Sequence, residues 1–413
     1  MKHTLTKVAA LLFGVAILLT GQGLQGTLIP TRAGLENFST VTIGIIGACY
    51  FLGFTIGCLR GGVLLRSVGH VRVFAAMTAA ASAAPLVLGL WADPLLWGVL
   101  RFITGFCFAV LFIVIESWLN GCTSNESRGG VFSVYIFITL TVMALGQLMM
   151  LMYDPRDLEL FVVASILVSS ASIPVVLSRS EAPEKPKEVR IDLRRLFRIS
   201  PSGATSCFAA GMTNGSFWAI SAIFATQITG DIDSAAWYMT SGVIGGAICQ
   251  WPLGLLSDRM DRRRVLSAAA LGAAVVSAVI VLFGARLPEL SLMLLGALWG
   301  GMSFPLYSVA VALTNDRAES DENVRVSSGL LLLFGIGAVI GPVLASVVMG
   351  AMGPQGLYVF SGAVHLLLFG YLNQRKSNRS PVPIEQRKDF STALACAQTA
   401  STVYESGPKD DVA

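Results

Sequence analysis

Residues 254–262 read GLLSDRMDR, and residues 62–70 read GVLLRSVGH. Each stretch follows a long apolar run, and the two copies are 192 residues apart. Arg101–Gly105 and Ala297–Gly301 correspond in the same way, with an offset of 196 residues. Duplicated halves are a known architecture of membrane proteins. The spacing therefore predicts two related halves, joined by the sequence between the two copies.

The composition is that of a chain surrounded by lipid. Of the 413 residues, 54% are apolar and 13% are charged, and the mean hydropathy is +0.70. An average soluble domain has about 25% charged residues. A helix that crosses a bilayer needs roughly 20 apolar residues. Twelve candidate spans meet this requirement, at residues 7–30, 42–64, 73–91, 95–118, 130–152, 158–178, 203–228, 235–256, 265–285, 288–314, 327–350 and 355–373. We expect an all-α integral membrane protein with twelve transmembrane helices in two pseudo-symmetric six-helix bundles.

The basic residues indicate how the chain is oriented. If the N-terminus is cytoplasmic, 25 Lys and Arg residues fall on the cytoplasmic side of these spans and three fall outside. This bias satisfies the positive-inside rule and argues against nucleic-acid binding. We expect a multi-pass protein of the cytoplasmic (inner) membrane with both termini in the cytoplasm. The expected units are an N-terminal bundle (1–178), a basic cytoplasmic linker (179–202), a C-terminal bundle (203–373) and a disordered tail (374–413).

The sequence contains no pattern typical of a metal or cofactor site. Its seven cysteines show no C-x-x-C spacing and lie mostly in apolar runs, where cysteine behaves as a small hydrophobic residue. No glycine-rich phosphate-binding loop is present, and no cluster of His, Cys and carboxylate residues occurs in the spans. We therefore expect no cofactor, no bound metal and no enzymatic activity.

The repeated loop resembles the signature of the major facilitator superfamily, G-x-L-x-D-R-x-G-R-K/R. The two copies retain the motif residues Gly62, Gly69, Gly254, Asp258, Arg259 and Arg262. The first copy departs from the motif with Arg66 in place of Asp, and the second has Asp261 in place of Gly. Within the superfamily the chain is similar to bacterial YcaD-type permeases, in the segments Gly44–Gly57, Val114–Ser117 and Gly245–Gly254. The resemblance implies a transporter with a central site that is exposed alternately to each side.

Arg101 is the main candidate for substrate binding, because an ionisable residue within a span is costly in a bilayer and is a functional candidate by default. It is either a cavity-lining cation for an anionic group or a hydrogen-bonding hub between helices. The resemblance implies that the first and fourth helices of each half line the cavity, which favours other residues over Tyr50 and Gln250. The candidate substrate-binding residues are Arg101, Gln22, Gln25, Asn214 and Trp218.

Gating residues are expected in the two repeated loops and in the nearby helix ends. In the first half, Glu116 would form a gate-closing ion pair with Arg66. In the second half, Asp258 and its neighbouring arginines would form the equivalent latch. The candidate gating residues are Gly62, Arg66, Gly69, Glu116, Arg128, Gly254, Asp258, Arg259 and Arg262.

Two residues are candidates for proton coupling. Three interpretations of Glu116 are open: it forms the gate, it carries a proton, or its side chain extends to water at the membrane surface. His365 lies in the middle of the last span and titrates near neutral pH, so it is either a proton-coupling residue or a buried core residue.

These patterns predict a secondary transporter of a small organic solute, coupled to protons. A carboxylate is favoured because the deep charge is the cation Arg101. The alternative is a proton/drug antiporter that exports lipophilic compounds, and a third hypothesis is a membrane sensor or scaffold that uses the linker and tail. We expect a monomer whose partners are a small-molecule substrate, the lipid bilayer and protons.

Overall fold

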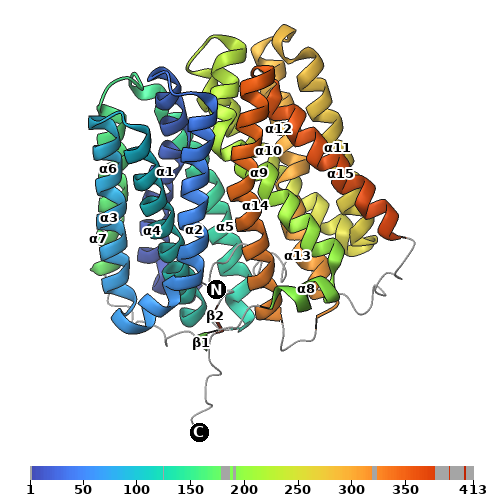
Figure 1. Cartoon of the computed structure of the whole chain (residues 1–413). Helices are drawn as coiled ribbons and strands as arrows, with labels where there is room; N and C mark the ends of the chain where they lie inside the picture. The colour runs from blue at the N-terminus through green and yellow to red at the C-terminus, as the bar shows by residue number, and fades with distance from the viewer. Residues whose placement is uncertain are drawn as a thin grey trace.

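The computed structural model describes residues 2–123, 125–177, 192–318 and 323–376, together with 187–188, 390 and 404–405. Residues 2–7, 125–129, 187–188, 323–324, 376 and 404–405 are described by their backbone alone. Almost all of this part of the chain is helical. The helices of the N-terminal half form one side of the molecule and those of the C-terminal half form the other (Figure 1).

Each half consists of a series of long helices. The N-terminal half contains α1 (Lys2–Leu35), α2 (Thr40–Val68), α3 (His70–Leu90), α4 (Pro94–Cys122), α5 (Asn125–Leu148), the short 3-10 helix η1 (Met149–Met152), α6 (Glu159–Ser170) and α7 (Ser172–Val176). The C-terminal half contains α9 (Pro201–Thr229), α10 (Ser234–Arg259), α11 (Arg262–Phe283), η2 (Gly284–Arg286), α12 (Glu289–Ser303), α13 (Pro305–Asn315), α14 (Asn323–Met352) and α15 (Gly356–Lys376). Within the predicted linker lie β1 (Lys187–Glu188) and α8 (Leu193–Ile199), and β1 pairs antiparallel with β2 (Tyr404–Glu405) of the tail.

All twelve predicted spans are helical. Eleven helical segments in the described residues are long and apolar enough to cross a membrane. The span predicted at residues 203–228 is α9, which is 29 residues long but is rich in Gly, Ser and Thr. Other helices bury α9 over most of its length, so its small polar side chains face protein rather than lipid.

Two of the predicted spans are interrupted helices. The span predicted at 158–178 breaks at Ala171, between α6 and α7, and the span predicted at 288–314 breaks at Phe304, between α12 and α13. Pro174 and Pro305 lie just beyond these breaks. Proline has no backbone N–H and its ring collides with the carbonyl four residues earlier, which kinks or breaks a helix.

The two halves repeat the same helix pairings. In the N-terminal half α1 packs on α5, α2 on α4 and α3 on α6. In the C-terminal half α9 packs on α14, α10 on α12 and α11 on α15. A Cβ atom on Gly53 of α2 would collide with the Phe102 carbonyl of α4, and one on Gly245 of α10 would collide with the Ala297 carbonyl of α12. These glycines are 192 residues apart (245 minus 53), which is the offset of the repeated loop.

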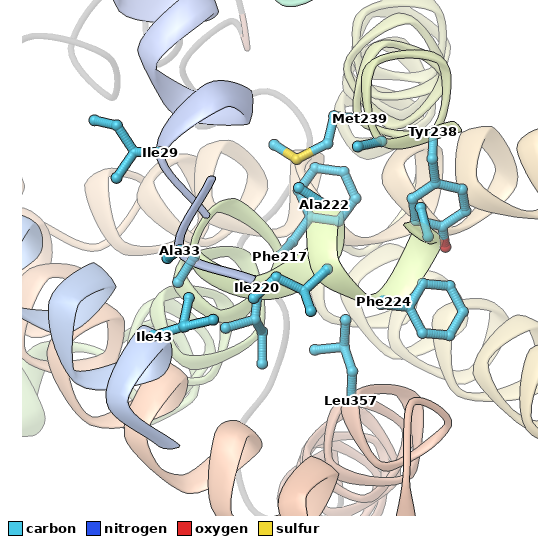
Figure 2. Close-up of a cluster of buried hydrophobic side chains, with 14 of the residues drawn as sticks. Ile29, Ala33, Ile43, Phe217, Ile220, Ala222, Phe224, Tyr238, Met239 and Leu357 are labelled. Atoms are coloured by element: carbon cyan, nitrogen blue, oxygen red, sulfur yellow. The ribbon is translucent and has the colours of Figure 1, made fainter. Parts of the chain in front are cut away.

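The two ends of the bundle differ in how the halves meet. We call the end where α2 meets α3 and α10 meets α11 the basic end, which is the lower end in Figure 1. At the opposite end, one hydrophobic cluster joins both halves. Figure 2 shows Ile29, Ala33 and Ile43 of the N-terminal half beside Phe217 and Ile220 of α9.

At the basic end each half has a hydrophobic cluster of its own. The cluster of the N-terminal half contains Val110 and Leu119 of α4, and that of the C-terminal half contains Leu266 of α11 and Leu313 of α13. The halves therefore share one buried cluster at the opposite end. At the basic end the buried members of each cluster come from a single half, and Leu331 of α14 packs against the N-terminal cluster.

Candidate functional site

A cavity of about 260 Å³ lies between the two halves. Its walls come from α1, α2, α4 and α5 on one side and from α9 and α14 on the other. Most of the lining side chains are aromatic or aliphatic. The polar ones are Gln22, Gln25, Tyr50, Thr55, Arg101 and Ser328, with the indole of Trp218. The volume lies just below the range of about 300–1,000 Å³ that is usual for ligand pockets, so the cavity suits a compact solute.

Arg101 lies against the ring of Tyr50 in this cavity. The Arg101 Cζ atom is 4.2 Å from the centroid of the ring, which is a cation–π contact. Gln22 Nε2 donates a hydrogen bond of 2.8 Å to the Tyr50 hydroxyl. The three side chains thus form a chain of contacts from α1 through α2 to α4.

The guanidinium of Arg101 has no carboxylate within ion-pair distance among the residues that the structure describes. Gln25 lines the same cavity, is 2% exposed, and both polar atoms of its amide lack a hydrogen-bond partner there. The Tyr50 hydroxyl accepts from Gln22, and its own O–H remains available to donate. The polar part of the cavity therefore has unused hydrogen-bond donors on Tyr50 and Gln25, unpartnered amide oxygens on Gln22 and Gln25, and one positive charge.

Close packing of α2 and α4 positions Arg101. A Cβ atom on Gly105 would collide with the Tyr50 carbonyl, so only glycine allows the two backbones to approach this closely. Arg101 lies one turn before Gly105, and residues four apart share a helix face. The glycine therefore holds Arg101 beside Tyr50.

The structure brings most of the predicted binding residues together. Gln22, Gln25, Arg101 and Trp218 line the cavity, whereas Asn214 does not. The Asn214 side chain instead accepts a hydrogen bond of 2.8 Å from Ser303, which links α9 to α12. The sequence favoured other residues over Tyr50, because the implied lining helices were the first and fourth of each half. Tyr50 lines the cavity because α2 also contributes to its wall.

Glu116 lies behind the cavity wall. Its side chain is fully buried on α4, and it forms a hydrogen bond with Tyr135 of α5. It also interacts electrostatically with Cys58, whose side chain lines the cavity. An ion pair between Glu116 and Arg66 remains a prediction. The side chain of Arg128 lies outside the described residues.

His365 is buried in the C-terminal half and does not line the cavity. Its Nδ1 lies 2.8 Å from the Ser361 carbonyl oxygen, a distance at which the ring N–H donates. The ring packs at an edge-to-face angle against Trp299, and the Trp299 indole donates to the Ser361 hydroxyl at 3.0 Å.

An ion-pair network lies at the basic end of the C-terminal half. The side chain of Arg262 is 1% exposed, and its Nη2 donates to Asp258 Oδ1 at 3.0 Å. Its Nε lies 2.8 Å from Asp316 Oδ2, and the Asp316 side chain is 2% exposed. Arg259 is exposed. Asp316 was not among the predicted gating residues, and it directly follows Asn315 at the end of α13.

Both loop motifs have a defined structural role. Gly69 separates α2 from α3 with a φ of +96°, which is a conformation that favours glycine, and its N–H donates to the Leu65 carbonyl. Gly254 of the second motif lies against the ring of Phe390, which belongs to the tail and is buried. The Phe390 backbone N–H donates to the Asp258 carboxylate at 3.1 and 3.3 Å.

In the part of the chain that the structure describes, no group of three or more His, Cys, Asp and Glu side chains is arranged to hold a metal ion. No disulfide joins the cysteines that the structure describes, which are Cys49, Cys58, Cys107, Cys122, Cys207 and Cys249.

Comparison with known proteins agrees with this architecture. The chain is 25% identical over 378 residues to the uncharacterized MFS-type transporter YcaD of Escherichia fergusonii, which covers 91% of this chain and 97% of that protein. The solved structure of the nucleoside transporter NupG is similar with a TM-score of 0.75, at 12% identity, over 92% of this chain and 100% of that chain. A bacterial homologue of the human lysosomal transporter Spinster, in an inward-facing and occupied conformation, is similar with a TM-score of 0.73, at 13% identity, over 92% of this chain and 98% of that chain.

At these identities the two solved structures show a common fold only. The family description of the Major Facilitator Superfamily matches residues 11–202 and again residues 203–402, so that each half of the molecule is matched once. The matched ranges meet between residues 202 and 203, at the start of α9. The chain therefore belongs to the major facilitator superfamily, as a multi-pass membrane protein of this transporter family.

Proposed function

We propose that the protein is a secondary active transporter that moves a small organic solute, with a carboxylate favoured, across the cytoplasmic membrane. The observation that supports this most directly is the cavity between the halves, where Arg101 lies without a carboxylate partner among the described residues. A charge that is largely withdrawn from water is stabilised by a partner of opposite charge, and an organic acid can supply one. We also propose that the bundles correspond to residues 1–178 and 203–373, with 179–202 as the linker.

Alternating access follows from the way the halves meet. If the basic end is cytoplasmic, as the distribution of Lys and Arg favours, this conformation is the inward-facing state. The shared core at the opposite end would close the route from outside, and the separate cores at the basic end would leave a route to the cytoplasm. A rocking movement of the halves would then expose the cavity to the other side.

We assign proton coupling to Glu116. Its carboxyl group is buried, contacts Tyr135 and lies behind Cys58 in the cavity wall, so a solute in the cavity can alter its charge state. His365 is a weaker candidate because it lies away from the cavity. The Glu116→Gln variant should lose accumulation driven by a proton gradient and keep solute exchange. Normal accumulation by this variant would reject the assignment.

The function can be tested by counterflow in proteoliposomes with labelled carboxylates, amines, neutral solutes and lipophilic cations. We expect carboxylate exchange that falls strongly in Arg101→Gln. Movement of lipophilic cations alone would favour the drug antiporter, although a free guanidinium in the cavity wall would repel such compounds. Deletion of residues 376–413 should preserve the flux. If no solute moves and the tail is required for the cellular role, the scaffold hypothesis would be favoured instead.

A further inference from the structure

We propose that the cavity selects amphipathic organic monoanions. One oxyanion head group would bind Arg101, and a compact apolar body would contact the aromatic and aliphatic walls of both halves. This inference rests on the proposed transport function and specifies its substrate class. It depends on the charge, the hydrogen-bonding capacity and the apolar lining of a single cavity.

The polar groups that would bind the head group come from the N-terminal half. Arg101 supplies the charge, the Tyr50 hydroxyl can donate, and the buried Gln25 amide has unused donors in the same cavity. No carboxylate neutralises Arg101 among the described residues, so one negative charge on the solute balances the site. A second negative charge would have to lie against apolar side chains, and a positive charge would be repelled.

The rest of the cavity is suited to an apolar body. Phe54 and Phe112 of the N-terminal half lie edge to face with ring centroids 6.1 Å apart. Leu331 and Phe334 of α14 and Trp218 of α9 form the facing wall. Each methylene group that enters such a wall should tighten binding about fourfold, from the free energy of burying apolar surface. The cavity volume of about 260 Å³ limits the body to roughly one ring or a short chain.

The two parts of the solute would contact different parts of the protein. The head group would contact only the N-terminal half, while the body would contact both. A solute without a body would therefore bind weakly, and it would contribute little to bringing the two walls together during transport.

The test is isothermal titration calorimetry of the full-length protein in nanodiscs, paired with counterflow in proteoliposomes. The probes are phenylacetate, its neutral analogue phenylacetamide, the cation phenethylamine, the dianion benzylmalonate, and the series acetate, butyrate and hexanoate. We expect phenylacetate and hexanoate to bind, with affinity rising along the series. We expect phenylacetamide, phenethylamine and benzylmalonate to bind at least tenfold more weakly than phenylacetate.

The variants identify the cause of any selectivity. Arg101→Gln should weaken phenylacetate binding about ten- to hundredfold, the value of a lost charged hydrogen bond, and should leave phenylacetamide unchanged. Arg101→Lys should retain the preference for the anion. Arg156→Gln is the matched control, because Arg156 lies in an exposed loop outside the cavity and pairs with Asp154.

Equal binding of phenylacetate and phenylacetamide, or of acetate and hexanoate, would overturn the proposal. If only the neutral or the cationic probe exchanged, the proposed substrate class would be rejected. The proposed transport function would still be supported. If none of the probes bound or moved, the substrate class would be rejected, and the wider solute panel above would then decide whether the protein is a transporter.

Discussion

Arg262, which is buried, and Arg101, which is half-buried, have opposite surroundings. Arg262 is neutralised by Asp258 and by the buried Asp316, so its charge is satisfied within the fold. Arg101 has the Tyr50 ring beneath it and no carboxylate partner among the described residues. Because a cation–π contact compensates for desolvation less completely than an ion pair, Arg101 retains capacity for an anion. The charge of Arg262 is thus paired within the fold, whereas that of Arg101 has no carboxylate partner among the described residues.

Arg262→Met should lower the free energy of unfolding by about 3–5 kcal/mol, because it removes the positive charge that pairs with the buried carboxylate of Asp316. The double variant Arg262→Met/Asp316→Leu should recover much of this loss, since both charges of that ion pair are then absent. The measurement is thermal or denaturant unfolding in detergent. Arg259→Met is the control, because Arg259 is the exposed neighbour in the same motif and its removal should have little effect. A double variant less stable than Arg262→Met would contradict this account.

At the scale of helices, glycines decide how closely α2 approaches α4 and how closely α10 approaches α12. The collisions that a Cβ atom would cause are with backbone carbonyls, which cannot rotate away as side chains can. The repeated loop motifs predicted the duplication. The packing shows that the same offset also places Gly53 and Gly245 at equivalent helix crossings.

Gly245→Ala should therefore lower stability by about 1–3 kcal/mol, because the added methyl group forces α10 away from α12. Gly370→Ala in α15 is the matched control, since a Cβ atom there meets nothing within 4 Å. That control should be neutral or should raise stability by up to about 1 kcal/mol, because alanine favours the helix. The measurement is the thermal unfolding of both variants. An equal change in stability for Gly245→Ala and Gly370→Ala would contradict the proposed role of close packing.

The tail contributes a contact to α10 that composition alone did not predict. Phe390 packs against Gly254, and its backbone N–H donates to the Asp258 carboxylate. The expected disordered tail thus contains at least one buried residue, while most of residues 374–413 lie outside the described part of the chain.

A double-mutant cycle tests this contact. Gly254→Ala should destabilise the protein because the new Cβ collides with the Phe390 ring, and Phe390→Ala should destabilise it by removing buried apolar surface. In the Phe390→Ala background, Gly254→Ala should cost almost nothing, which gives a coupling energy of about 1 kcal/mol or more. Additive effects in thermal unfolding would show that the two residues do not interact. Phe197→Ala, at an exposed ring on α8, serves as the control.

For the whole molecule, the important asymmetry is between its two ends. Among the described residues, the buried cluster that joins both halves lies at the end opposite the basic loops (Figure 2). In an alternating-access cycle this shared core must separate, because the route to that side opens there. The contacts between α2 and α14 at this end are therefore expected to form and break during transport.

A reversible cross-link can test this requirement. At that end a Cβ atom on Gly350 would lie 3.7 Å from Val41 Cγ2, which is within reach of a disulfide between the two positions. In a background without the native cysteines, Val41→Cys/Gly350→Cys should lose transport on oxidation and recover it on reduction. Solute binding from the basic end should persist in the oxidised protein. Undiminished transport by the cross-linked protein would show that this interface stays closed throughout the cycle.

The sequence by itself determined the class of the protein and its duplication. Apolar runs of bilayer length, the bias of Lys and Arg and the repeated loop each depend on local composition or on spacing along the chain. Hydropathy was less informative for α9, because a helix surrounded by protein can carry small polar residues that lipid would exclude.

Only the tertiary structure decided which polar residues share a cavity. Arg101 was identifiable because a charge within a span is costly, but its contact with Tyr50 depends on the close crossing of α2 and α4. The same applies to Asn214 of α9, which accepts a hydrogen bond from Ser303 of α12. It also applies to Asp316, which follows α13 and forms an ion pair with Arg262 at the start of α11. Such pairings arise from helix packing between residues far apart in the chain, and no local pattern in a single sequence records them.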